Sequence, residues 1–198
     1  MTEQGGRMGP YGRWFKRWVD LAIAGGGVFV FALPMGWIAW RLRQELGPPV
    51  LFRQTRVGWR RKPFTVLKFR TMTTAGTVPS PFCRRLRARA LDELPQLVNI
   101  LRGEMSFVGP RPLIPEELET LERLPRGADR LLLRPGLTGL AQLYSPKVPT
   151  LSERLRWDLA YADRCSLLLD LGILLRSVVV TLRGAWEKPG SPMPPEQP

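Results

Sequence analysis

The sequence predicts an α+β protein, mostly helical, with a re-entrant N-terminal membrane helix and a small β-hairpin. Three observations predict this class: an uncharged apolar run over residues 21–40, two short strand-like runs after it, and helix-like patterns with capping signals over the remainder. We expect a flexible tail over residues 1–12, the membrane helix over 13–46, a cytosolic domain with amphipathic interfacial helices over 47–186, and a disordered Pro-rich tail over 187–198.

The apolar run, at about 20 residues or roughly 30 Å of straight helix, is long enough to cross a bilayer. Pro34 lies inside the run and should break or kink the helix after Leu33. Lys and Arg prefer the cytoplasmic side of a membrane, and here they flank both ends: Arg13, Lys16, Arg17, Arg41 and Arg43. We therefore expect the helix to enter the membrane, bend at Pro34 and leave on the same face. A buried soluble helix is the alternative.

Aromatic residues at both ends support the membrane interpretation. Because tryptophan favours the membrane–water interface, four of them are expected to act as interfacial anchors: Trp14, Trp18, Trp37 and Trp40.

The composition limits the chemistry. A formal net charge of +13 indicates an anionic partner, which could be nucleic acid, anionic lipid or a phosphorylated substrate. The chain has no His, which excludes Ser-His triads, His-ligated zinc and imidazole proton transfer. Cys83 and Cys165 form no motif and indicate reduced thiols in a cytosolic compartment. A hard cation such as Mg²⁺, held by carboxylate and phosphate oxygens, fits this inventory.

After the apolar run, residues 50–57 and 63–70 are expected to form the hairpin, with residues 58–62 as its loop. Further helices are expected over residues 82–90, 97–101, 115–124, 150–164 and 166–182. The fourth of these is opened by a capping box at Thr150 and Glu153, and the last is closed by Gly184.

Two adjacent acids, Asp92 and Glu93, precede the short helix at residues 97–101. Asp92 is placed as an N-cap, Pro95 falls in the first turn, and Gly103 is placed to end the helix. A helix N-terminus favours an ionised carboxylate, which can be a nucleophile or a metal ligand. The alternative is that Asp92 only caps the helix and Glu93 only points to solvent.

Two later segments could bind anions. Arg111 stands between Pro110 and Pro112, which stiffen the backbone and orient its guanidinium group toward a phosphate or carboxylate. The turn at residues 134–139 carries Arg134 and two glycines, and it could hold an anion or be an ordinary turn.

Taken together, five motifs resemble the bacterial sugar transferase family, the monotopic polyprenyl-phosphate phosphoglycosyltransferases, in their small catalytic-core form. The motifs are Lys16-Arg17-x-x-Asp20-Leu21, Lys68-Phe69-Arg70-Thr71-Met72, Leu91-Asp92-Glu93-Leu94-Pro95-Gln96, Met105-Ser106-x-Val108-Gly109-Pro110-Arg111-Pro112 and Arg134-Pro135-Gly136-Leu137-Thr138-Gly139. The resemblance covers roughly residues 14–184.

The resemblance implies a reaction at the cytoplasmic face of the bacterial inner membrane. A phosphosugar would pass from a UDP-sugar to undecaprenyl phosphate, with Mg²⁺, as the first step of a surface glycan pathway such as exopolysaccharide or lipopolysaccharide biosynthesis. Asp92 would be the nucleophile that forms a phosphosugar ester, and Glu93 would organise the metal or handle a proton. Positive charge around the diphosphate can come from five side chains: Lys68, Arg70, Arg87, Arg111 and Arg134.

The chain departs from the family pattern at three places, which affect sugar specificity and membrane geometry. Leu33 stands where Ser often precedes the bend proline, Ala90 where Ser or Thr is common, and the loop between Met72 and Leu86 is shorter than usual. The competing hypothesis is a membrane-tethered basic module that binds nucleic acid or anionic lipid. Because no nucleic-acid motif is present, we expect the partners to be the UDP-sugar, undecaprenyl phosphate and inner membrane lipids.

Overall fold

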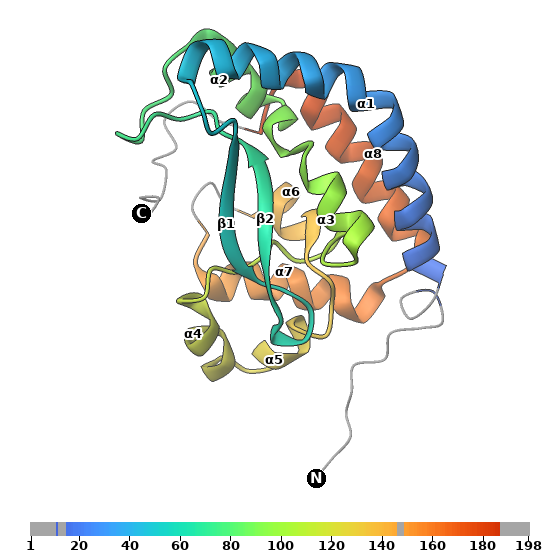
Figure 1. The fold of residues 1–198 in the computed structure, drawn as a ribbon. Coiled ribbons are helices and arrows are strands. Elements are labelled where there is room, and N and C mark those ends of the chain that lie inside the picture. Colours follow the sequence, from blue (N-terminus) through green and yellow to red (C-terminus); the bar gives the residue numbers. More distant parts are fainter. Residues whose placement is uncertain (1–10, 12–14, 146–148, 187–198) are drawn as a thin grey trace.

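The computed structural model describes Tyr11, residues 15–145 and residues 149–186 of the chain. The expected N-terminal tail, apart from Tyr11, the expected C-terminal tail and Trp14 lie outside the described residues. The α+β class is confirmed: helices surround a two-stranded antiparallel hairpin, and a second, shorter sheet lies in the interior (Figure 1).

The first helix, α1 (Lys16–Leu46), is continuous through Pro34. Figure 1 shows that it bends along its length, so that its second part turns across the end of the molecule. Pro34 therefore accompanies a bend rather than a break, because the helix resumes beyond the missing N–H. In the part of the chain that is described, this is the one helix long and apolar enough to cross a membrane. Its apolar side chains are largely exposed; Phe29 and Leu33 are 85% and 86% exposed.

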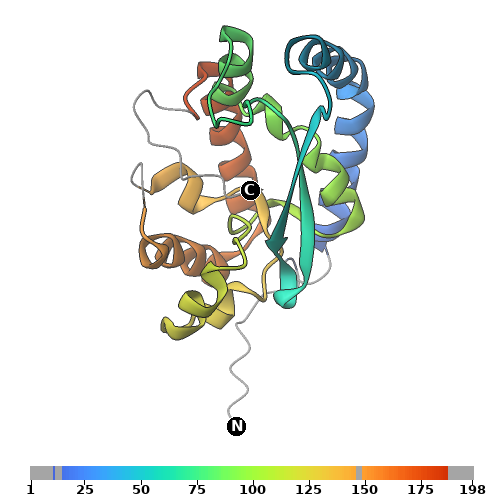
Figure 2. The ribbon, with the colours of Figure 1, turned by 60° about the vertical axis from the view of Figure 1, so that its left-hand side comes forward.

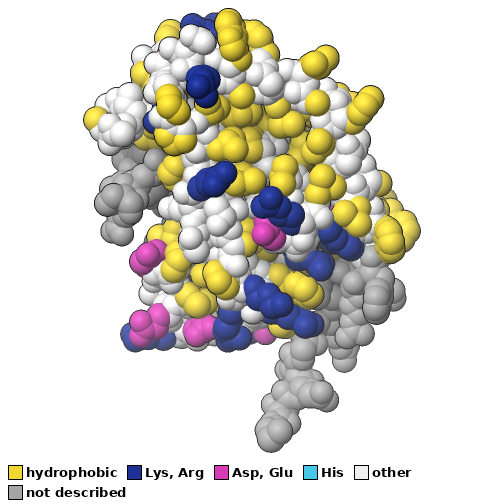
Figure 3. Space-filling view, in the orientation of Figure 1, with side chains coloured by type: hydrophobic (Ala, Val, Ile, Leu, Met, Phe, Trp, Pro, Cys, Tyr) yellow, Lys and Arg dark blue, Asp and Glu magenta, His cyan; other side chains and the backbone are white. Residues whose placement is uncertain are grey.

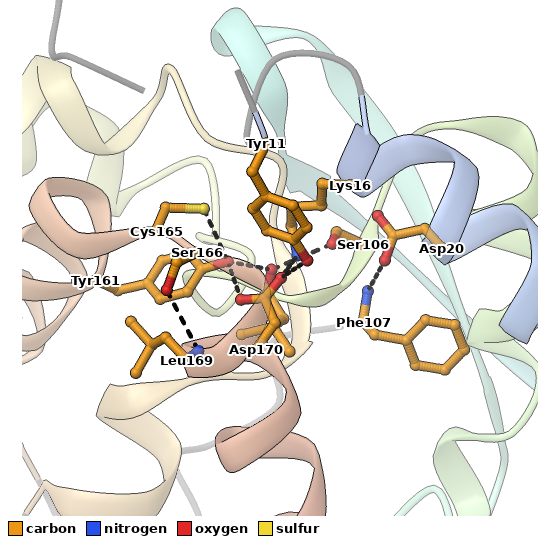
Figure 4. A network of polar contacts seen from close by, with 11 residues as sticks. Tyr11, Lys16, Asp20, Ser106, Phe107, Tyr161, Cys165, Ser166, Leu169 and Asp170 are labelled. Atoms are coloured by element: carbon orange, nitrogen blue, oxygen red, sulfur yellow. Dashed lines mark hydrogen bonds and ion pairs between the residues drawn. The ribbon is translucent and has the colours of Figure 1, made fainter. Parts of the chain in front are cut away.

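The start of α1 is tied to the C-terminal helices through one buried carboxylate. Asp170, in the first turn of α8 (Leu167–Arg183), accepts hydrogen bonds from the Tyr11 hydroxyl at 2.8 Å and the Tyr161 hydroxyl at 2.7 Å (Figure 4). Lys16 completes the group through an ion pair with the same carboxylate. A buried charge bonded in this way is costly to separate from its partners, so the network holds the beginning of α1 against the domain.

The end of α1 is attached to the same domain. Arg70 follows strand β2 (Pro63–Phe69), and its guanidinium donates to the carbonyl oxygens of Leu46 at 2.7 Å and Gly47 at 2.6 Å. A guanidinium at this position satisfies carbonyls that a helix C-terminus leaves without partners. Both ends of the apolar helix are thus held by one folded unit.

The predicted hairpin is confirmed. Strand β1 (Leu51–Val57) pairs antiparallel with β2 in a register that places Leu51 opposite Phe69. The connecting turn η2 (Trp59–Arg61) lies within the loop expected at residues 58–62. Phe64 and Val66 of β2 are buried in a core shared with α1 and α3 (Gln96–Arg102). In Figure 2 the hairpin stands between α1 and the pair formed by α6 (Leu140–Tyr144) and α7 (Leu151–Arg164).

A parallel pair of short strands, β3 (Ser106–Val108) and β4 (Gly136–Thr138), was not predicted. The turn expected at residues 134–139 is largely this second strand. Backbones approach so closely there that a Cβ on Gly136 would lie 2.1 Å from the nitrogen of Gly109. Only glycine allows this contact. Because Gly109 is two residues before Arg111, the contact also packs the segment around Arg111 against the domain interior.

Helices α2 (Pro81–Ala88) and α4 (Glu117–Arg123) follow the prediction. The turn η3 (Leu91–Glu93) and the short helices α5 (Gly127–Arg130) and α6 were not predicted. The capping box at Thr150 and Glu153 opens α7, and Gly184 ends α8 in the left-handed conformation, both as predicted.

The placement of Asp92 as an N-cap was wrong. Ala90 adopts a left-handed conformation with φ 52°, and the chain then makes the turn η3 before α3 begins after Pro95. Asp92 is therefore inside a tight turn one step before the helix. Gly103 ends α3 with φ 82°, as predicted.

Candidate active site

The turn η3 presents Asp92 and Glu93 between α2, the hairpin and α3. Lys68 of β2 meets this turn, and its Nζ atom lies 2.6 Å from Oε1 of Glu93. Gln96, in the first turn of α3, also hydrogen-bonds the Glu93 carboxylate. Strand β2 and the start of α3 therefore hold Glu93 in one orientation, while Asp92 lies beside it, 8% exposed.

A cleft opens beside Glu93 and is lined largely by charged and polar side chains. Arg111 enters it from the Pro-Arg-Pro segment, Lys68 and Arg56 from the hairpin, and Gln96 from α3. Figure 1 shows α3 beside the hairpin, although the two are separate in the chain. Three of the lining side chains are positively charged, so the cleft favours an anion beside Glu93.

The two acids have different proton affinities. Burial and the neighbouring Glu93 charge raise the pKa of Asp92 to about 6, although Lys68 and Arg87 oppose this rise. Burial also disfavours ionised Glu93, but Lys68, Arg111 and the Gln96 hydrogen bond outweigh it and lower the pKa of Glu93. At neutral pH both acids are mainly ionised, and Asp92 is the one closer to titration. Lys68 and Arg87 are the nearby cations that favour charged Asp92, whereas the expected position of Asp92 as the N-cap of α3 is not found.

Arg111 is held through its backbone. Arg130 donates from its guanidinium to the carbonyl oxygen of Arg111 at 2.6 Å, and its Nε atom lies 2.6 Å from Oδ2 of Asp158. Arg130 and Asp158 are both buried, so the pair is shielded from water and from salt. The guanidinium of Arg111 itself extends into the cleft from this fixed backbone.

The structure brings together most of the predicted site residues. Glu93, Lys68 and Arg111 meet at the cleft, and Asp92 lies next to Glu93, close enough to Lys68 and Arg87 for both to stabilise its ionised form. Two others are engaged elsewhere. Arg70 binds the carbonyls at the end of α1, as described above.

Arg134 lies away from the cleft. Its Nε atom donates to the carbonyl of Gly103 at 3.1 Å, and its guanidinium carbon lies 4.3 Å from the centre of the Trp59 ring. Substrate binding by Arg70 and Arg134 stays a prediction.

Two cleft residues were missed. Arg56 was assigned only to a strand, and Gln96 only to the end of the acidic motif, because the register that turns Arg56 toward Lys68 depends on hairpin pairing. The available signal was that each strand-like run carries a basic residue, Arg56 in the first and Lys68 in the second.

The carboxylates suit a metal held jointly with substrate. Within the described ranges, no group of three or more His, Cys, Asp or Glu side chains converges as a metal cage. Asp92 and Glu93 are adjacent acids in the turn η3, and Glu93 lines the cleft. Mg²⁺ is commonly held by one or two carboxylates together with substrate phosphates, and this donor set fits that arrangement.

Comparison with known proteins decides the family. A sequence model of the bacterial sugar transferases matches residues 11–184. The chain belongs to the bacterial sugar transferase family. The resemblance inferred from the five motifs is thereby confirmed.

Among the relatives of this transferase, the UDP-glucose:undecaprenyl-phosphate glucose-1-phosphate transferase of Caulobacter vibrioides is 39% identical over 181 residues, covering 82% of this chain and 68% of the relative. The uncharacterised sugar transferase EpsL of Bacillus subtilis is 38% identical, covering 69% of this chain and 72% of its own length. The exopolysaccharide production protein ExoY of Rhizobium meliloti is 32% identical, covering 94% of both chains.

Proposed function

We propose that this chain transfers a sugar phosphate from a UDP-sugar to undecaprenyl phosphate, as the first step of an exopolysaccharide or related surface glycan pathway. The observation that carries the proposal is the Asp92–Glu93 pair, whose second member lines a cleft together with Lys68, Arg56 and Arg111. Relatives whose names state this reaction with UDP-glucose support the substrate classes.

In the first step, an ionised oxygen of Asp92 attacks the phosphorus that carries the sugar. The bond from that phosphorus to the bridging oxygen breaks, and UMP leaves with the bridging oxygen. In the second step, an oxygen of undecaprenyl phosphate attacks the same phosphorus and displaces the Asp92 carboxylate, which is thereby restored. A carboxylate nucleophile lets a soluble donor and a membrane-held acceptor react in turn at one site.

The basic side chains near the acidic pair stabilise the negative charge of the reacting phosphate. Phosphoryl transfer depends mainly on positioned positive charge around the phosphate oxygens. Lys68 and Arg111 are placed for this, and Arg87 also favours the ionised nucleophile. Glu93, ionised and bonded to Lys68, keeps that ammonium group oriented toward the cleft.

We include Mg²⁺ in the proposal. Asp92 and Glu93 would hold it together with the donor diphosphate, where it would neutralise charge on the phosphate oxygens.

The attachment of α1 supports a monotopic position on the cytoplasmic face of the inner membrane. A straight helix across the bilayer would place its ends on opposite sides, whereas both ends of α1 bind the same domain. The bend in α1 and the basic residues at both ends agree with a re-entrant course. Helix α8 adds an apolar stripe for the interface, formed by Leu168, Leu171, Leu175, Val178 and Leu182.

The test is UMP release and trapping of the adduct. With a panel of UDP-sugars, UDP-glucose first, undecaprenyl phosphate and Mg²⁺, the enzyme should release UMP continuously. Without the acceptor, it should release about one UMP per enzyme, and mass spectrometry should find a phosphosugar on the peptide that contains Asp92. An adduct on Glu93 would contradict the assignment of the nucleophile. Absence of UMP with every UDP-sugar, combined with nucleic-acid binding, would favour the basic binding module instead.

A further inference from the structure

Two arginine side chains, Arg60 and Arg134, lie against the Trp59 ring, and a third, Arg17 of α1, lies close to Arg134. The guanidinium carbons of Arg134 and Arg60 lie 4.3 Å and 4.6 Å from the centre of the Trp59 ring. Arg17 approaches from α1, and its guanidinium is close to Gly103, the residue whose carbonyl accepts a hydrogen bond from Arg134. We call Arg17, Arg60, Arg134 and Trp59 the Trp59 cluster.

The Trp59 cluster has more positive charge than its surroundings neutralise. Across residues 15–145 and 149–186, none of its arginines forms an ion pair with an acid. Arg17 donates to the carbonyls of Ile100 at 2.6 Å and Leu101 at 3.0 Å, at the end of α3. A helix C-terminus offers only about half a negative charge. Burial and the charge of Arg17 lower the pKa of Arg134, and Asp20 only partly offsets them.

The loop holds Arg60 in the cluster at a conformational cost. Arg60 and Arg61 have φ angles of 53° and 62°, in the left-handed region that side chains other than Gly, Asn and Asp rarely adopt. The backbone N–H of Arg60 donates to the carbonyl of Leu131 at 2.7 Å, which fixes this conformation. Arg60 thus adds a third positive charge next to Arg134, which is also close to Arg17, and guanidinium groups grouped in this way are suited to bind an anion.

We propose that the Trp59 cluster binds the phosphate of an anionic phospholipid headgroup at the membrane surface. The inference rests on the proposed membrane position of α1. Arg17 lies in the first turn of that helix, and Trp18 beside it is 70% exposed. In Figure 3, hydrophobic side chains cover the part of this face over α1, and Lys and Arg side chains gather below them.

The source of the phosphate follows from this location. The cytoplasmic leaflet is negatively charged and attracts basic side chains next to a membrane helix. Guanidinium groups bind phosphate through two parallel hydrogen bonds, and an indole ring suits the depth of the headgroups. The donor diphosphate, by contrast, has its own cations at the cleft, Lys68 and Arg111.

The loop offers a matched pair of variants. Arg60→Asn and Arg61→Asn each remove one positive charge, and Asn tolerates the left-handed backbone at both positions. Arg61 is the control because its Nε atom pairs with Oε1 of Glu122 at 2.6 Å, outside the Trp59 cluster. If lipid binding depends on general electrostatic attraction, both variants should bind the lipid equally weakly. If the lipid binds at the Trp59 cluster, only Arg60→Asn should weaken binding.

The full chain in neutral detergent is titrated with dioctanoyl phosphatidylglycerol, dioctanoyl phosphatidylcholine, inorganic phosphate or UDP-glucose, and thermal unfolding is measured. We expect phosphatidylglycerol, and not phosphatidylcholine, to raise Tm by roughly 4–8 °C in the wild type and in Arg61→Asn at large lipid excess. The rise should fall by at least half in Arg60→Asn. Steady-state UMP release in detergent, with undecaprenyl phosphate but without added phospholipid, should be the same in both variants.

Two results would overturn the proposal. Equal Tm rises in Arg60→Asn and Arg61→Asn would remove the Trp59 cluster as the site. A rise with inorganic phosphate or UDP-glucose that is lost only in Arg60→Asn would make it a site for soluble phosphates. If the wild type released no UMP, the proposed function would fail while the lipid-dependent Tm rise could still be measured, so the two failures are distinguishable.

Discussion

Replacing Asp92, the proposed nucleophile, should stabilise the protein while it abolishes turnover. Asp92 is 8% exposed, and burial together with Glu93 raises its pKa from 3.8 to about 6. A rise of this size means that ionised Asp92 costs the folded state about 3 kcal/mol at pH 7. Asp92→Asn keeps the shape and removes the charge, so we expect a gain of about 1–3 kcal/mol, or a Tm rise of roughly 3–10 °C.

The sign of the pH dependence provides a second measurement. Because the folded pKa of Asp92 lies above its unfolded value, the cost of ionisation is fully present above about pH 6 and fades as the pH falls toward 3.8. The difference in Tm between Asp92→Asn and the wild type should therefore shrink between pH 7 and pH 5. Wild-type UMP release should fall over the same range, because protonated Asp92 cannot attack phosphorus.

The assay is thermal unfolding in detergent, followed by tryptophan fluorescence, alongside UMP release. Asp163→Asn is the control: that carboxylate is exposed and pairs with Arg126, which lowers its pKa, so its loss should not stabilise the protein. Lower stability of Asp92→Asn at pH 7, or a Tm difference that is unchanged at pH 5, would refute the raised pKa. Full turnover by Asp92→Asn would refute its role as the nucleophile.

Two further predictions concern substrate binding and topology. Arg111→Lys keeps the charge but loses the paired N–H donors, so kcat/KM for the UDP-sugar should fall roughly ten- to a hundredfold, and wild-type kinetics would remove Arg111 from the site. Single cysteines at Thr2 and Thr73, in a background without the two native cysteines, should both resist a membrane-impermeant thiol reagent in intact cells, because both flanks of α1 are expected in the cytoplasm. Labelling of one and not the other would show a complete crossing.

Local sequence determined those elements whose hydrogen bonds and contacts are short in range. The hairpin follows from strand-like residues on both sides of a five-residue loop, and α7 begins where Thr150 and Glu153 bond each other's backbone N–H groups. The family and the acidic pair were also identifiable, because the motif residues are contiguous. Such features need no knowledge of which distant segment lies alongside.

Tertiary structure decided what depends on distant partners. Asp92 resembles an N-cap in sequence, but the left-handed Ala90 and the packing of η3 against β2 place it in a separate turn. Strands β3 and β4 pair across almost thirty residues of chain, through glycines whose spacing alone indicates only a turn.

The arginines show the same limit. Arg111 faces the cleft, Arg70 binds the end of α1, and Arg134 joins the Trp59 cluster, although all three belong to motifs of the same family. A guanidinium group extends several bonds from its backbone and bonds whichever carboxylate, carbonyl or ring the fold brings near. Sequence therefore determined that this protein concentrates positive charge around an acidic pair, and only the folded chain decided which of those charges reach it.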